Sequence, residues 1–249
     1  MGVTVAEDSG RSPGVSWAVA GLATALLAAG FVWFAGIDLW FTGLFWNGTD
    51  GFFLRDAWWV RTMYQIIPIL SYSVVGIALI GLIVTAVRRR PLGPWRSRVF
   101  LYLIAVVAIG PGLVVNVVFK DHWGRARPRD VVEFGGTKAF TPAFVISDQC
   151  PKNCSFVAGH PSMAFAMVAL ALVAASPRPS RRRAWLIALV VAIGMVVGFG
   201  RIVQGGHFLS DVIFSAIFTV AVAVGLYRLF GLDPMSSGLD RSDAPSAGA

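Results

Sequence analysis

Long apolar stretches alternate with short polar segments over most of the chain. A helix needs roughly 20 residues to cross the hydrocarbon core of a bilayer, which is about 30 Å thick. Apolar runs of about that length lie at residues 15–36, 64–87, 99–119, 160–176, 184–200 and 208–230. The fourth and fifth runs are short, so their ends are the least defined. This pattern predicts an all-α, polytopic membrane protein with six transmembrane helices.

The segment between the first two runs mixes aromatic side chains with polar ones. Its aromatic residues are Trp40, Phe41, Phe45, Trp46, Phe52, Phe53, Trp58 and Trp59. Aromatic rings settle at the boundary between hydrocarbon and water, so we expect an interfacial helix or hairpin here. An aromatic belt is favoured over a guide for a lipid substrate, and the two roles are compatible.

Composition and charge agree with this topology. The chain is 56% hydrophobic and 14% charged, and its mean hydropathy of +0.71 excludes a soluble domain of this length. Many of the basic residues behind the net charge of +8 lie in two loops of the same parity, at residues 88–98 and 178–183. Because Lys and Arg in short loops stay in the cytoplasm, the charge predicts orientation, with both termini inside, and no nucleic-acid partner.

The two ends of the chain are polar. Residues 1–14 predict a cytoplasmic N-terminal segment before an uncleaved signal anchor, since no small-residue cleavage pattern ends the first apolar run. Residues 231–249 are rich in Ser, Gly, Asp and Pro and predict a disordered cytoplasmic tail. Residues 15–230 then form one membrane domain without a repeat of fixed period.

Three segments at the ends of apolar runs carry basic or imidazole groups. They are residues 120–128, 155–160 and 200–211, and the predicted topology puts all three on the non-cytoplasmic side. A phosphate monoester carries close to two negative charges, which spread over its equatorial oxygens during transfer. Fixed cations from these segments could surround it, and the fork of an Arg side chain suits phosphate oxygens.

The remaining groups in these segments suit attack at phosphorus. His207 is the candidate nucleophile, because a neutral imidazole reacts near pH 7. Asp211 lies one helical turn later, where its carboxylate could accept the other ring N–H. A carboxylate in an apolar helix is costly without such a partner. His160 is the candidate acid for the leaving alkoxide, and Gly159 would let the backbone approach the phosphate at a helix N-terminus.

The spacing of these residues strongly resembles the signature of the type 2 phosphatidic acid phosphatase (PAP2) superfamily over about residues 99–215. Six residues separate Lys120 from Arg127, five separate Arg201 from His207, and three separate His207 from Asp211. The resemblance implies a membrane lipid phosphatase that needs no metal or other cofactor. The roles that it implies are a phosphate clamp at Lys120, Arg127 and Arg201, an acid at His160, a phosphohistidine at His207 and an orienting carboxylate at Asp211.

The chain departs from the family pattern at two positions. Ala158 and Gly200 stand where the family commonly has Ser. The first change removes a hydroxyl donor to the phosphate, which bears on the rate more than on the reaction class. A backbone N–H at residue 158 could take the place of that hydroxyl.

The sequences of three loop segments narrow the resemblance to one group within the superfamily. Residues 120–129, 133–136 and 150–154 look like bacterial lipid A 4′-phosphatase-like members, which implies a lipid A phosphate at the periplasmic face of an inner membrane. Phosphatidylglycerol phosphate, phosphatidic acid and undecaprenyl pyrophosphate stay open as substrates, as does phosphate transfer between lipids.

A vanadium haloperoxidase shares this type of site, but those enzymes are soluble. A transporter or weakly catalytic lipid-binding protein is the other alternative, although no internal repeat or broken helix supports transport. The partners expected are the bilayer and a lipid phosphate, and the sequence predicts no oligomeric state.

Cys150 and Cys154 lie in one outer loop. In an oxidising periplasm they predict a disulfide that closes a small loop shortly before His160, with free thiols as the alternative. Two Cys supply too few ligands for a metal ion, so we expect no metal site.

Overall fold

The structure is a computed structural model that describes residues 13–174 and 181–232. The regular secondary structure of these residues is helical, with no β-strand apart from isolated bridges such as the one between Trp46 and Phe52. The predicted N-terminal segment up to residue 12, Arg178, and the tail beyond residue 232 lie outside the described residues. The all-α prediction is confirmed.

Long helices follow one another along the chain. The elements are α1 (Pro13–Trp33), α2 (Gly36–Gly43), α3 (Trp58–Arg88), α4 (Ser97–Val107), the π-helix η1 (Ala108–Lys120), the 3₁₀ turns η2 (Pro128–Asp130) and η3 (Val132–Phe134), α5 (Gly159–Ala166), α6 (Val168–Ala174), α7 (Arg181–Val203) and α8 (Leu209–Leu229).

Each of the six predicted apolar runs contains helix within the described residues, but the helices do not all have the length of a span. Within the described residues α3, α4 with η1, α7 and α8 are long and apolar enough to cross a membrane, and α1 with α2 makes a fifth if the bent pair is one span. The pair bends by 73°, whereas the sequence pattern predicted no broken helix. The segment Gly159–Ala174 is apolar but shorter. The protein is therefore a multi-pass membrane protein, and the number six stays a prediction.

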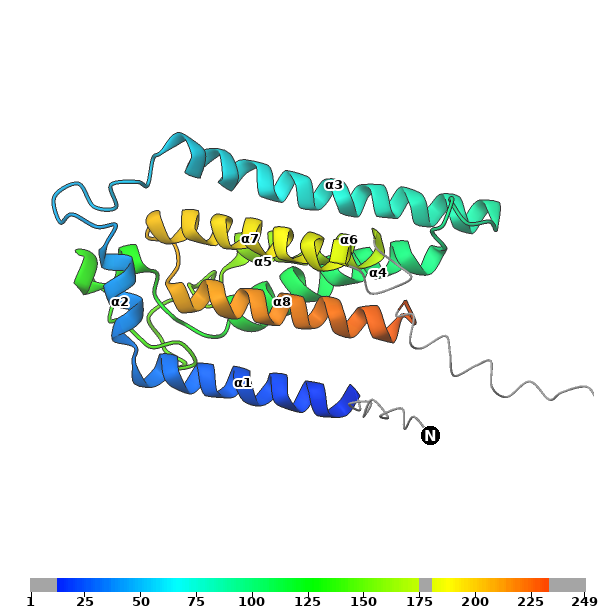
Figure 1. The fold of residues 1–249 in the computed structure, drawn as a ribbon. Coiled ribbons are helices and arrows are strands. Elements are labelled where there is room, and N and C mark those ends of the chain that lie inside the picture. The colour runs from blue at the N-terminus through cyan, green and yellow to red at the C-terminus, as the bar shows by residue number, and fades with distance from the viewer. Residues whose placement is uncertain (1–12, 175–180, 233–249) are drawn as a thin grey trace, which may run out of the picture.

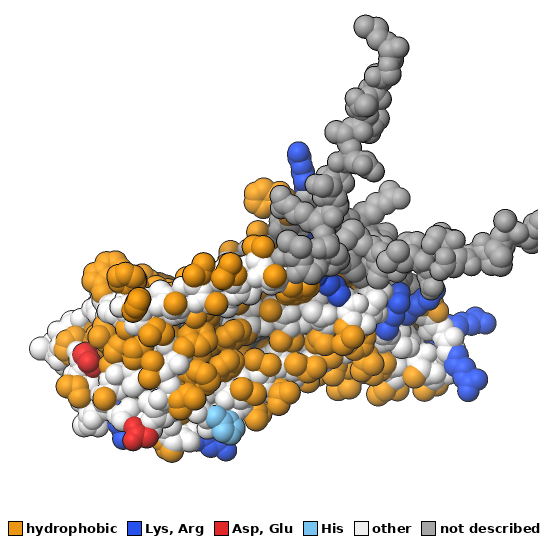
Figure 2. Space-filling view, turned by 90° about the horizontal axis from the view of Figure 1, so that it is seen from below, with side chains coloured by type: hydrophobic (Ala, Val, Ile, Leu, Met, Phe, Trp, Pro, Cys, Tyr) orange, Lys and Arg blue, Asp and Glu red, His pale blue; other side chains and the backbone are white. Residues whose placement is uncertain are grey.

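The long helices run side by side along one axis, and α2 turns across one end of the bundle (Figure 1). The loop between η1 and α5 gathers at that same end, and both ends of the described chain lie at the other (Figure 1). Figure 2 shows hydrophobic side chains over the middle of one face and charged side chains at its two ends. This distribution suits a bundle whose middle lies in lipid.

Small residues let α7 lie close to its neighbours. A Cβ atom on Gly194 would come within 2.2 Å of the Phe165 ring, and one on Gly198 would come within 2.2 Å of Val212. Close packing of this kind stabilises helix pairs in lipid, where burial of apolar surface contributes little. The contacts fix the end of α7, which carries Arg201, against α5 and α8.

The predicted interfacial segment corresponds to α2 and the loop that follows it. Trp40 is 65% exposed, as expected for an aromatic residue that faces the bilayer boundary. The opposite side of α2 packs on α8 and buries Asp38 and Thr42 completely. The sequence did not predict a buried carboxylate here.

Candidate active site

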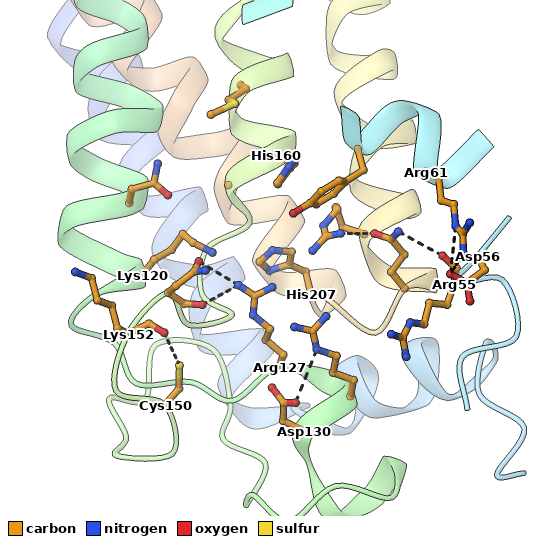
Figure 3. A pocket seen from close by; sticks show the side chains of 18 residues that line it. Arg55, Asp56, Arg61, Lys120, Arg127, Asp130, Cys150, Lys152, His160 and His207 are labelled. Atoms are coloured by element: carbon orange, nitrogen blue, oxygen red, sulfur yellow. Dashed lines mark hydrogen bonds and ion pairs between the residues drawn. The ribbon is translucent and has the colours of Figure 1, made fainter. Parts of the chain in front are cut away.

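Three segments that are far apart in the sequence line one cavity of about 590 Å³ at the α2 end of the bundle (Figure 3). The end of η1 and the loop after it contribute Lys120 and Arg127, the start of α5 contributes Gly159 and His160, and the end of α7 contributes Arg201. His207, in the turn between α7 and α8, also lines the cavity. The structure thus brings together every predicted clamp and histidine residue around one cavity. Asp211 does not line the cavity, and its Oδ2 lies 3.5 Å from Nδ1 of His207.

The three clamp cations are held by neutral groups. Lys120 Nζ donates to the carbonyl of Cys154 at 3.0 Å, and Arg127 donates to the carbonyl of Asn153 at 2.7 Å. Arg201 donates to the side chain of Gln204. None of the three cations forms an ion pair with a carboxylate in the part of the chain that the structure describes. Cations held this way can bind an anion without first breaking a salt bridge.

His207 is almost fully buried, with 1% of its surface exposed. Its Nδ1 lies 2.8 Å from the carbonyl oxygen of Ser155 and 3.5 Å from Oδ2 of Asp211. A carbonyl oxygen only accepts, so Nδ1 must carry the proton, and in the neutral ring Nε2 keeps its lone pair. Burial lowers the pKa of His207 well below its usual value, which keeps the ring neutral. The ring is therefore set up as a nucleophile through Nε2.

The partner of His207 differs from the one predicted. We expected Asp211 to accept the ring N–H, but the Ser155 carbonyl is closer. The Asp211 carboxylate instead accepts from the Ser155 hydroxyl at 2.5 Å and from the Phe208 backbone N–H at 2.8 Å. Asp211 therefore acts on the ring at 3.5 Å by its charge and by holding Ser155.

A buried ion network continues behind Asp211. Arg125 donates to Asp211 Oδ1 at 2.6 Å and to Asp38 Oδ2 at 2.8 Å, and all three side chains are 0% exposed. Ser210 joins them, since its backbone N–H donates to Asp38 at 2.8 Å. Sequence reasoning missed Arg125, Asp38, Ser155 and Ser210. The signal for Asp38 was available, because it is an acidic residue among apolar ones, which is costly without a partner.

His160 lies in the first turn of α5 and stacks on Tyr64 of α3, with ring centroids 4.2 Å apart. The same Tyr64 ring lies 4.8 Å from Cζ of Arg201. One aromatic side chain thus contacts both the candidate acid and a clamp cation. Tyr64 was not predicted from the sequence, because it lies in a long apolar run. His122, the third histidine, is exposed and binds the Val117 carbonyl at 2.7 Å, and it does not line the cavity.

The comparisons with known sequences agree with this geometry. The family model described as the PAP2 superfamily matches residues 100–233. The chain belongs to the PAP2 superfamily. It is 40% identical over 210 residues to the lipid A 4′-phosphatase of Francisella tularensis subsp. novicida. The aligned part covers 80% of this chain and 88% of that relative. It is 33% identical over 219 residues to the lipid A 4′-phosphatase of Rhizobium etli, which covers 82% of this chain and 83% of the relative. The protein of the same name from Rhizobium leguminosarum is 32% identical over 219 residues, covering 82% and 91%. No solved structure matches the chain.

In this PAP2-superfamily protein the backbone N–H of Ala158 does not take the place of the Ser hydroxyl that the family commonly has at this position. The backbone N–H of Ala158 donates to the carbonyl of Asp211 at 3.1 Å, so it is not free for a phosphate. The Ala158 side chain is fully buried among Phe165, Ile202 and Val212 and does not line the cavity. The prediction that this N–H replaces the missing hydroxyl is therefore wrong. Gly159, the next residue, does line the cavity, beside Asn116 and Lys120.

The two cysteines of this PAP2-superfamily protein are joined by a disulfide, with their Cα atoms 5.6 Å apart. The backbone of Cys154 contacts Lys120 twice: its N–H donates to the Lys120 carbonyl at 2.9 Å, and its carbonyl accepts from Lys120 Nζ. The disulfide loop thus holds the clamp lysine directly. In the described residues no group of three or more His, Cys, Asp or Glu is placed to hold a metal ion.

Proposed function

We propose that this PAP2-superfamily protein is a lipid A 4′-phosphatase of the bacterial inner membrane, with its site open to the periplasm. Membership of the family and the names of its relatives make it a phosphatase that acts on a phosphomonoester. The observation that carries the proposal is the cavity itself. Lys120, Arg127 and Arg201 surround a neutral His207 whose Nε2 lone pair is free. The choice of lipid A as the substrate rests on the names of the curated relatives.

The orientation is supported by the distribution of charge. The basic loop at residues 88–98 and the basic start of α7 lie at the end of the bundle opposite the cavity. Positively charged loops stay in the cytoplasm, so the cavity would face the periplasm. A lipid in the outer leaflet of the inner membrane could then present its headgroup to the site.

The geometry supports a two-step reaction. Lys120, Arg127 and Arg201 bind the nonbridging oxygens of the phosphoryl group and stabilise their charge in the transition state. Nε2 of His207 attacks phosphorus while the bond to the sugar oxygen breaks, and the departing alkoxide takes a proton from His160. The bound phosphate dianion favours the protonated form of His160. Throughout this step Nδ1–H of His207 stays on the Ser155 carbonyl.

Hydrolysis of the phosphohistidine completes the cycle. His160, now neutral, takes a proton from a water molecule, which attacks phosphorus and breaks the P–N bond. Inorganic phosphate leaves, and His207 returns to its neutral form with the proton still on Nδ1. The charge of Asp211, 3.5 Å from Nδ1, stabilises the positive ring that exists while Nε2 is bonded to phosphorus.

Phosphate release by purified protein tests the proposal. The protein in detergent should release the 4′-phosphate of lipid A in the presence of EDTA, with mass spectrometry identifying the position lost. Phosphatidylglycerol phosphate, phosphatidic acid and undecaprenyl pyrophosphate serve as competing substrates, and His207→Ala as the inactive control. Faster release from one of these lipids than from lipid A would contradict the proposed substrate.

A further inference from the structure

The cavity carries more positive charge than one phosphate group requires. Its basic lining residues are Arg55, Arg61, Lys120, Arg127, Arg129, Lys152 and Arg201. Its acidic lining residues are Asp56 and Asp130. Seven cations against two carboxylates leave a net charge of five, and a phosphomonoester dianion neutralises about two of these charges. About three positive charges then stay uncompensated around the bound substrate.

The outer cations are the basic lining residues that do not belong to the clamp: Arg55, Arg61, Arg129 and Lys152. They differ in how closely each is paired with a carboxylate. Arg61 lies 2.6 Å from Asp56, a full ion pair. Arg129 reaches Asp130 only at 3.8 Å, with about half of each side chain exposed. Arg55 is exposed, and its side chain makes no hydrogen bond or ion pair within the described residues. Lys152 also forms no ion pair with a carboxylate in the described chain, but it lies across His207 from Arg55 (Figure 3). Arg55 and Arg129 are therefore the two cations beside the turn between α7 and α8 that have capacity for another anion.

Both arginines have a fixed backbone although their side chains are exposed. The N–H of Arg129 donates to the carbonyl of Gly205 at 3.1 Å, in the turn that leads to His207. The carbonyl of Arg55 accepts from Gln204 at 3.4 Å, and Gln204 also accepts from Arg201. The turn between α7 and α8 thus sets the position of the two outer arginines relative to the nucleophile. Burial, and after it the charge of Arg129, lowers the pKa of Arg127, so the outer and inner cations lie within electrostatic reach of each other.

The size of the cavity leaves room beyond the phosphoryl group. Its volume of about 590 Å³ is in the range of pockets that hold a drug-sized ligand. Figure 3 shows Arg55 on one side of His207 and Lys152, with the disulfide loop, on the other. A headgroup with its reactive phosphate at His207 could place a second acidic group near Arg55 without leaving the cavity.

We propose that Arg55 and Arg129 form a second anion subsite, which binds another acidic group of the same lipid headgroup, a phosphate or a carboxylate. The inference rests on the proposed function in that the substrate is a lipid phosphate. The subsite further requires that the substrate carries two acidic groups and that Arg55 and Arg129 bind the second one. Both guanidiniums suit bidentate contacts with such a group.

A comparison of two substrates tests the subsite. Wild type and the double variant Arg55→Gln/Arg129→Gln are assayed on bisphosphorylated lipid A and on lipid A that carries only the 4′-phosphate. Exposed ion pairs are weak individually, so we expect kcat/KM on the bisphosphorylated lipid to fall about 3- to 10-fold, mainly through KM. On the monophosphorylated lipid the change should stay within about 2-fold. Lys138→Gln changes an exposed cation of the outer loop that does not line the cavity and serves as the charge control.

Two results would overturn the subsite. Equal losses on both lipids would show a general electrostatic effect. Weaker binding of the double variant to vesicles of phosphatidylglycerol, with no difference between the two lipid A substrates, would show that the anion is a neighbouring phospholipid.

Different results would contradict the proposed function and the proposed subsite. If wild type releases phosphate from phosphatidylglycerol phosphate and not from lipid A, the proposed substrate is wrong. The same variants are then compared on phosphatidylglycerol phosphate, with two phosphates, and phosphatidic acid, with one. A selective loss on the first would still support the subsite, and equal losses would overturn it.

Discussion

Two groups of charged side chains lie on opposite sides of His207, and the fold treats them in opposite ways. Behind the ring, Asp38, Arg125 and Asp211 are fully buried and paired at 2.6 to 2.8 Å. In front of it, the three clamp cations have no carboxylate partner in the described chain. A buried charge is costly unless it is paired. The rear group therefore satisfies itself, and the front group is completed only by a bound anion.

The two groups also place opposite charge around the nucleophile. One arginine between two carboxylates leaves the rear group with one net negative charge, and the front group carries three positive charges. The front charge suits the phosphate oxygens. The rear charge stabilises the imidazolium that forms when Nε2 of His207 bonds to phosphorus. We therefore expect removal of the rear arginine to lower mainly the stability of the fold, and removal of a front cation to lower mainly turnover.

The largest effect is expected where the two groups meet. His207→Ala should abolish turnover, and His160→Ala should lower kcat by about 10²- to 10⁴-fold. With an activated phosphate ester, whose leaving group needs no proton, only the His160 variant should still form a phosphoenzyme, which rapid-quench labelling would detect. His122→Ala, on the exposed loop, is the matched control. Label on the His207 variant would assign the nucleophile elsewhere.

Breaking the rear group should unfold the protein more than it changes the chemistry. Arg125→Met leaves Asp38 and Asp211 buried without their cation, so we expect a loss of about 3–5 kcal/mol in the free energy of unfolding. Thermal unfolding in detergent measures it, with Arg129→Met, whose side chain is half-exposed, as the control that should change little. An Arg125 variant as stable as wild type would remove the structural role of this network.

Breaking the front group should do the reverse. Arg201→Gln removes one cation from the transition state, and the loss of a single such donor typically lowers kcat by about 10²- to 10³-fold. Stability should change by less than about 1 kcal/mol, because no carboxylate loses its partner. Turnover and unfolding measured on the same preparation separate the two effects. A loss of stability comparable to that of Arg125→Met would erase the distinction between the two groups.

The smallest effect concerns Ala158, which belongs to neither group. Ala158→Ser adds a hydroxyl among Phe165, Ile202 and Val212 rather than in the cavity. We expect kcat/KM on the best lipid substrate to stay the same or to fall slightly. A rise of about 3- to 10-fold, the size of a partly realised hydrogen bond to a charged group, would mean that the hydroxyl reaches the phosphate.

The helical membrane architecture, the clamp residues and the two cavity histidines could be predicted from the amino-acid sequence alone. The apolar runs have few alternatives to a helix, because lipid offers no partner for free backbone groups. The segments that carry Lys120, Arg127, His160, Arg201 and His207 all lie at the ends of such runs. The predicted six crossings put these ends on one side, and the structure places the five residues around one cavity. Their spacing is local along the chain, which is why it could be recognised.

The buried groups behind the nucleophile could not be predicted from local sequence, because they meet only through tertiary contacts. The bond between Asp38 and Ser210 joins residues 172 positions apart, and the one between Arg125 and Asp38 spans 87. The 73° bend that brings α2 onto α8 places Asp38 there, and no local pattern predicts that contact. The choice of the Ser155 carbonyl over Asp211 as the partner of His207 likewise depends on differences of less than 1 Å between groups on separate segments. Hydrophobic periodicity specifies which residues enter the bundle, but packing alone decides which buried polar groups meet.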